Sequence, residues 1–224
     1  AYAGTLALPT VPSTGWTTTD IAAITTADVS SLTTGSIANL SSDQVTALVS
    51  TVLGALGSAQ IAAFATDALK ALSNTQLKSL SSSSISGLTS TQINALGTDG
   101  ISTFTSAQIR GLDTSDIRAL TSSQLAALGT ASISALRASQ IAAIASDAFG
   151  ALSTAQLSSL SSSEIAGLTA GQVASLGTTG LAALSTDQLR GLDTDDIQAL
   201  TTAQVQSLGA AGINALRSDQ VAAI

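Results

Sequence analysis

The sequence predicts an all-α solenoid of very short, two-turn helices, with an eight-residue unit and about 16 residues per coil. Two observations predict this fold class. Residues 17–224 are 26 consecutive octads without insertion or deletion, and each octad carries an aliphatic residue or Phe at positions 5 and 8. A period this strict indicates one structural unit that is stacked many times.

The spacing inside the octad favours a helix. Positions 5 and 8 lie three residues apart, which places them on one face of a helix but on opposite faces of a strand. One uninterrupted helix is excluded because Ser, Thr, Gly or Asp occurs at almost every octad start. Helices of two turns do not form alone in water, so each needs neighbours that cover its apolar positions.

Local chemistry predicts where each helix begins. In residues 105–112, TSAQIRGL, Thr105 is expected at the N-cap and Gln108 at the third helical position, which together form a capping box. Phe104 and Ile109 have the spacing of a hydrophobic staple. The S/T-x-x-Q spacing occurs nine times at this phase, at Ser41/Gln44, Ser73/Gln76, Thr89/Gln92, Thr105/Gln108, Thr121/Gln124, Ser153/Gln156, Thr169/Gln172, Ser185/Gln188 and Thr201/Gln204.

A second period predicts the coil. Gln occupies position 4 of every second octad, at Gln44, Gln60, Gln76, Gln92, Gln108, Gln124, Gln140, Gln156, Gln172, Gln188, Gln204 and Gln220. We interpret this as a 16-residue coil of two helices, with the Gln residues as a ladder along one edge. A repeated helix cap explains them without any ligand. Position 7 carries small residues, among them glycines at 87, 111, 167 and 191, which predicts close helix packing.

A third period is an 80-residue duplication, because residues 65–144 match residues 145–224 octad for octad. The rare charges recur in it, as the pairs Arg110/Arg190, Asp113/Asp193, Asp116/Asp196 and Arg137/Arg217. They are either a contact between neighbouring filaments or coils, or a solvated cluster of ion pairs. The second interpretation is favoured because exposed ion pairs contribute little to stability.

Residues 1–16 do not follow the octad and form a separate N-terminal arm. The arm contains both prolines, and Pro9 and Pro12 favour an extended path. It is expected either to cap the first coil or to dock on the next subunit. The last octad ends at Ile224 in mid-pattern, which favours docking in a head-to-tail homopolymer. The predicted subunit-contact residues are Tyr2, Leu6, Leu8, Val11, Trp16 and Ile224.

Composition excludes several function classes. The net charge is −7 with only seven Lys and Arg, so no basic surface exists for nucleic acid or an anionic membrane. No apolar run is long enough for a membrane span. Cys, Met and His are absent, which excludes disulfides, thiolate or imidazole metal sites and nucleophile–His catalysis. We expect no cofactor, and an extracellular or cell-surface location suits this durable, weakly charged composition.

The run at residues 201–224, TTAQVQSLGAAGINALRSDQVAAI, resembles the Thr/Gln/Ala/Leu-rich tandem repeats of very large bacterial surface proteins. These are adhesins, also called haem-utilisation-or-adhesion proteins, and the resemblance covers residues 17–224. It implies a cell-surface or matrix location and an adhesive or structural role, and it transfers no binding residue. Haem use finds no support because His, Cys and Met axial ligands are absent.

The leading functional hypothesis is a non-enzymatic structural protein of an extracellular bacterial filament, adhesin stalk or biofilm fibre. The alternative is a binding module that presents a Ser/Thr lattice to ice or to a cell-surface or matrix polysaccharide. Catalysis has little support, although Asp113 with Asp116, or Asp195 with Asp196, form possible carboxylate pairs. The GTDGI run at residues 97–101 lacks the ligand spacing of an EF-hand calcium loop.

Overall fold

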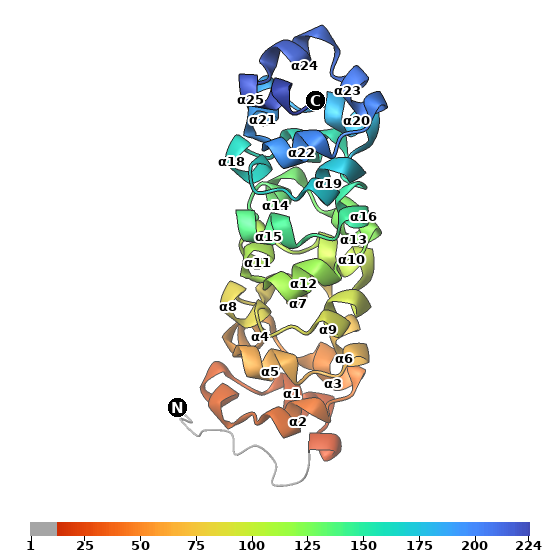
Figure 1. Cartoon of the computed structure of the whole chain (residues 1–224). Coiled ribbons are helices and arrows are strands. Elements are labelled where there is room, and N and C mark those ends of the chain that lie inside the picture. The colour runs from red at the N-terminus through yellow and green to blue at the C-terminus, as the bar shows by residue number, and fades with distance from the viewer. Residues whose placement is uncertain (1–12) are drawn as a thin grey trace. The chain divides into compact units, whose positions relative to one another are not determined.

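The computed structural model describes residues 13–224, and every regular element in this part of the chain is a short helix or 3-10 turn (Figure 1). The chain divides into two compact units, residues 1–112 and residues 113–224. Each unit is a stack of helices and is described on its own. The all-α solenoid class is therefore confirmed.

Unit 1 begins with the 3-10 turn η1 (Ser13–Gly15). Its other elements are α1 (Thr18–Ala22), η2 (Thr26–Ser31), α2 (Thr34–Ala38), α3 (Ser42–Ala47), α4 (Ser50–Ala55), α5 (Ser58–Ala62), α6 (Thr66–Lys70), α7 (Asn74–Ser79), α8 (Ser82–Ile85), α9 (Ser90–Ala95), α10 (Gly97–Ser102) and α11 (Ser106–Gly111).

Unit 2 begins with α12 (Thr114–Ala119). It continues with α13 (Ser122–Ala127), α14 (Thr130–Ile133), α15 (Ala138–Ala143), α16 (Ser146–Phe149), α17 (Thr154–Ser158), α18 (Ser162–Ile165), α19 (Ala170–Ser175), α20 (Gly177–Ala182), α21 (Thr186–Gly191), α22 (Thr194–Gln198), α23 (Thr202–Ser207), α24 (Gly209–Ala215) and α25 (Ser218–Ala222).

One octad makes one helix and one extended corner. In the octad of α21, the N-cap Ser185 has an extended backbone with ψ 163°, and the C-cap Leu192 is extended with ψ 143°. Because these two residues connect neighbouring helices, only six remain for the helix itself. At 3.6 residues per turn, such a helix is slightly shorter than the predicted two turns.

The predicted 16-residue coil of two helices is wrong. Within each unit a helix packs on the third helix before it, so a coil holds three octads, or 24 residues. In unit 1, α3 packs on α1 and α6 packs on α3, while α2, α5 and α8 form a second column (Figure 1). In unit 2, α18 lies between α15 and α21 in the same way. Each octad has one helix and one corner, and three such sides bring the chain back over its start.

The core of each unit consists of positions 5 and 8. These residues are buried in the inner octads, and the Phe104 and Ile109 side chains of the expected staple are both among them. Position 7 lies where successive coils come close. A Cβ at Gly87 would lie 2.0 Å from the Ser58 carbonyl oxygen, and one at Gly111 would lie 2.3 Å from that of Ser82. At Gly167 the nearest atom would be 3.5 Å away, which is ordinary contact.

Three octads use a different corner, marked by Gly at positions 1 and 4. Gly97, Gly177 and Gly209 have φ values of 64°, 59° and 60°, in the left-handed region that favours glycine. Their preceding leucines are helical rather than extended, so one helix runs almost directly into the next. Gly129 has φ −67° and an ordinary extended corner, and its octad carries Ser132 at position 4.

Candidate functional site

The Gln residues at position 4 connect each coil to the one beneath it. Gln188 shows the arrangement, because its Oε1 accepts the Ser185 backbone N–H at 2.8 Å. Its Nε2 donates to the carbonyl oxygens of Leu157 at 2.8 Å and Leu160 at 2.7 Å. These acceptors lie 31 and 28 residues earlier, at positions 5 and 8 of the fourth octad before. We call this two-sided contact the glutamine clamp.

The clamp recurs in both units with little variation. The Oε1 atom of all twelve Gln residues accepts the N-cap backbone N–H at 2.8–3.1 Å. Contacts from Nε2 to carbonyl oxygens 28 to 31 residues earlier are made by Gln44, Gln60, Gln76, Gln92, Gln108, Gln156, Gln172, Gln188, Gln204 and Gln220.

The clamp explains why the residue is Gln. The end of a short helix leaves backbone N–H and C=O groups without partners inside the helix, and buried groups of this kind must be paired. A Gln side chain has an acceptor for one helix's N-terminal N–H and two N–H donors for another helix's C-terminal carbonyls. Each bond contributes about 0.5–1.5 kcal/mol, and an unpaired buried group costs about 1–3 kcal/mol.

The nine predicted capping boxes are confirmed. Besides the Oε1 contact, the N-cap hydroxyl accepts the Gln backbone N–H at 3.2–3.3 Å in all nine. At Gly57, Arg137 and Arg217 the Gln side chain makes its half of the contact alone. Most hydroxyls at position 1 are thus engaged in helix capping, which leaves them less suited to a lattice for an external ligand.

The candidate carboxylate pairs are helix caps. Asp193 Oδ1 accepts the Asp196 backbone N–H at 2.8 Å, and Asp196 Oδ2 accepts the Asp193 N–H at 3.0 Å. Asp113 Oδ1 accepts the Asp116 N–H at 2.8 Å in the same way. Asp196 is only 1% exposed, and burial raises its pKa to about 6, while its backbone hydrogen bond with Asp193 opposes the rise. A capping role accounts for the pair's position, whereas the neighbouring Asp195 is exposed.

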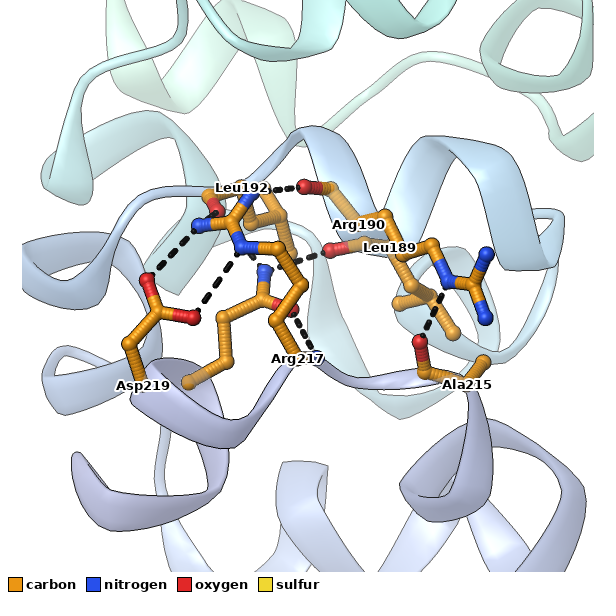
Figure 2. Close-up of polar contacts among 7 residues, drawn as sticks. Leu189, Arg190, Leu192, Ala215, Arg217 and Asp219 are labelled. Atoms are coloured by element: carbon orange, nitrogen blue, oxygen red, sulfur yellow. Dashed lines mark hydrogen bonds and ion pairs between the residues drawn. The ribbon is translucent and has the colours of Figure 1, made fainter.

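The recurring arginines join successive coils of unit 2 (Figure 2). Arg217 donates through Nη1 to the Arg190 carbonyl and through Nη2 to the Leu192 carbonyl at 3.3 Å. Arg190 in turn donates from Nε to the Ala215 carbonyl at 2.9 Å. Arg217 also pairs with Asp219, with 3.1 Å between Nε and Oδ1. The duplicated arginines thus contact backbone of another coil, and ion pairing is the smaller part of their role.

The predicted subunit-contact residues divide into three groups. Tyr2, Leu6, Leu8 and Val11 lie outside the described residues. Trp16 is 7% exposed, and its carbonyl accepts from Gln44 Nε2 at 2.6 Å, so it packs within its own chain. Ile224 is 58% exposed and Val221 is 48% exposed, unlike the buried residues at the same positions of inner octads.

Two hollows lie among the described residues. One of about 360 Å³ is lined by Thr14, Trp16, Thr18, Asn39, Ser41, Asp43 and Gln44. The other, of about 150 Å³, is lined by Leu181, Ala182, Leu184, Thr186, Leu189, Leu208, Ala211 and Gly212. Neither includes the carboxylate pairs. Within residues 13–224 no group of three or more Asp or Glu side chains is arranged to hold a metal ion, and no helix has the length and apolarity for a membrane span.

A family profile described as the ALTTAQ repeat matches almost all of the octad region, at residues 21–58, 61–98, 95–130, 109–146, 141–178, 174–202 and 191–224. The chain belongs to the ALTTAQ repeat family. Residues 199–204 of this chain read ALTTAQ. In the structure these letters cover the end of one octad, the N-cap Thr201 and the clamp residue Gln204, so they span the corner where one helix ends and the next is capped.

Membership in the ALTTAQ repeat family establishes a tandem structural repeat, and it does not extend to adhesion or haem use. No curated protein matches the chain. Two features of the ALTTAQ octads were missed from sequence. The G-x-x-G pattern that marks the left-handed corners was readable, while the long reach of the Gln side chain has no local signal.

Proposed function

We propose that this chain is a non-enzymatic structural protein of an extracellular bacterial filament, adhesin stalk or biofilm fibre, and that copies associate head to tail. The observation that carries the proposal is the construction of each unit from nearly identical stacked coils. Each coil buries positions 5 and 8 against its neighbours and accepts Gln donors from another coil. A stack of this kind presents edges that fit one another, so it can extend through contacts between copies.

The exposed apolar residues of α25 support association between copies. Val221 and Ile224 are 48% and 58% exposed, whereas Val45 and Leu48, at the same octad positions in an inner coil, are 0% and 3% exposed. Covering such aliphatic side chains contributes about 25 cal/mol per Å² of apolar area removed from water. Another coil of the same kind, stacked in register, would supply that cover.

The composition and polar contacts support the other parts of the proposal. The clamp residues and the Asp193/Asp196 pair are engaged with backbone groups, which suits a structural role better than catalysis. An extracellular or cell-surface location agrees with the resemblance to bacterial surface repeats and with a chain free of Cys and poor in Lys and Arg. Polysaccharide binding stays a secondary possibility for the exposed Ser and Thr residues at position 2.

The test compares two exposed valines by sedimentation and electron microscopy over a range of protein concentrations. The parent chain is expected to form linear assemblies, and Val221→Asp is expected to abolish them because a charge would be buried at the contact. Val49→Asp is the matched control, since Val49 is 41% exposed within unit 1. Short, monodisperse particles of the parent chain under all conditions would contradict the proposed function.

A further inference from the structure

The glutamine clamp nearest the N-terminus has unusual acceptors. Gln44 Nε2 donates to the carbonyl oxygens of Ser13 at 2.9 Å and Trp16 at 2.6 Å, again 31 and 28 residues earlier. These residues belong to the turn η1 and precede the first octad. The Trp16 N–H donates to the Ser13 carbonyl at 3.1 Å, as position 8 donates to position 5 in the octads. Ser13–Trp16 therefore occupies the place of an octad's last turn.

This turn fits the place less well than a true octad end would. Position 5 is apolar in all 26 octads, but the turn has Ser13 there. Ser13 is buried, and its hydroxyl is accommodated by a 2.7 Å hydrogen bond to the Ser36 carbonyl. A buried hydroxyl gains little from leaving water, whereas an aliphatic side chain at the same place is stabilised by its burial. An octad end in this position would thus be favoured over the turn.

The last turn of α25 has the required register. Val221 and Ile224 follow Ser13 and Trp16 by 208 residues, which is 26 whole octads. The Ile224 N–H donates to the Val221 carbonyl, so the local turn is the same. Its two apolar side chains are exposed in this chain, while Gln44 and the core positions Val45 and Leu48 of α3 are buried. The two partners of such a contact are therefore an exposed octad end and a place built to receive one.

We propose that Ser13–Trp16 is an exchangeable turn, and that Val221–Ile224 of a second copy replaces it beneath Gln44 when copies join. The inference rests on the proposed head-to-tail assembly and names the contact through which it forms. The Gln44 donors pass from Ser13 and Trp16 to the carbonyls of Val221 and Ile224. The turn thus protects the place in a single chain and is displaced by the better-fitting apolar turn.

A reversible disulfide provides the test, because the chain has no native Cys. Ser13→Cys with Ser36→Cys would hold the turn in place, since the Ser13 hydroxyl lies 2.7 Å from the Ser36 carbonyl oxygen. The oxidised variant is expected to need at least about tenfold more protein to assemble than the same variant after reduction. The control staple, Ser158→Cys with Ala183→Cys, lies inside unit 2 where the two residues touch, and should not change assembly.

A second measurement reads the register directly. The contact between Ser158 and Ala183 recurs between copies, if they join as proposed, as a contact between Gln206 and Ala23, which are both exposed. Gln206→Cys and Ala23→Cys in separate chains should therefore cross-link in assemblies. Assembly by the oxidised stapled chain, or assemblies without this cross-link, would overturn the exchange and leave head-to-tail association standing. A parent chain that never assembles would overturn both proposals.

Discussion

Three consecutive octads of unit 2, those of α20, α21 and α22, differ mainly in the residue at position 4. Gln188 in α21 both accepts and donates, and it holds the carbonyls of Leu157 and Leu160 in the coil beneath. Asp196 in α22 caps its own helix but, when ionised, has no proton to donate. Gly180 in α20 leaves room, since a Cβ there would lie 3.3 Å from Leu157 Cδ1 and 3.4 Å from Leu176 Cβ.

The difference separates two roles that share one position. All three octads form a helix, so the helix itself does not depend on Gln. What Gln adds is a bond to another coil, while Asp confines its contacts to its own octad and Gly changes the corner. The alternation of Gln with other residues therefore places clamps at every second octad, and the three-octad coil distributes them over all three columns of each unit.

The largest effect is expected when the clamp loses its donors. Gln188→Glu keeps the shape and the acceptor but places a buried carboxylate against two carbonyl oxygens. We expect a loss of about 3–5 kcal/mol in the free energy of unfolding at pH 8, and a smaller loss at acidic pH, where a protonated Glu can donate once. Urea unfolding followed by circular dichroism measures both values.

Gln198→Glu is the matched control, because Gln198 lies at the exposed end of α22 in the same coil. The control should change the free energy of unfolding by no more than about 0.5 kcal/mol. Equal losses from the two substitutions would show that the clamp contacts contribute nothing beyond the change of charge.

The second prediction concerns the buried carboxyl of Asp196. Its folded pKa of about 6 lies above the model value of 3.8, so the folded state binds its proton more tightly than the unfolded state does. The resulting stability is present at acidic pH and is lost as the pH rises through about 6. The difference in pKa corresponds to at most about 3 kcal/mol. Asp196→Asn should remove this part of the pH dependence and stabilise unit 2 at pH 8.

The exposed neighbour Asp195 provides the control for this measurement. Asp195→Asn keeps the buried carboxyl and should therefore keep most of the pH dependence. Thermal unfolding between pH 4 and pH 8 compares the three chains. A parent chain whose midpoint does not fall between pH 5 and pH 7 relative to Asp196→Asn would contradict the assignment.

The octad contained enough information to predict each helix, its cap and its buried positions. The capping box at Ser185 and Gln188 is a local pattern, and local patterns of this kind can be read from one sequence. The number of octads per coil could not be read in the same way. The Gln period of 16 residues was interpreted as the coil, but it reflects which octads carry clamps, while the coil of 24 residues depends on the angle of the corners.

The reach of the clamp was also beyond the sequence, because Gln188 and Leu157 are 31 residues apart and no motif connects them. The duplicated charges were interpreted mainly as a solvated cluster. Arg217 does pair with Asp219, yet its contacts with the backbone of Arg190 and Leu192 connect two coils. By contrast, Gly177 and Gly180 stand in a G-x-x-G pattern that could have indicated the third kind of octad start.

The smallest effect tests that third kind of octad. Gly177 has φ 59° at the start of α20, while Gly129 has φ −67° at the start of α14, and a Cβ at either position would meet nothing within 4 Å. The two glycines thus differ in backbone conformation and not in available space. Gly177→Ala is expected to destabilise unit 2 by about 1 kcal/mol, because a left-handed conformation is strained for a residue with a Cβ.

Gly129→Ala should be neutral or slightly stabilising, since it restricts the unfolded chain without straining the folded one. Urea unfolding of the two single variants measures the contrast, and the difference between them removes the effect that Ala has on the unfolded state. Equal effects would mean that the corner before α20 can relax to the extended form seen before α14. The residue at position 1 would then be interchangeable, and position 4 alone would distinguish the octads.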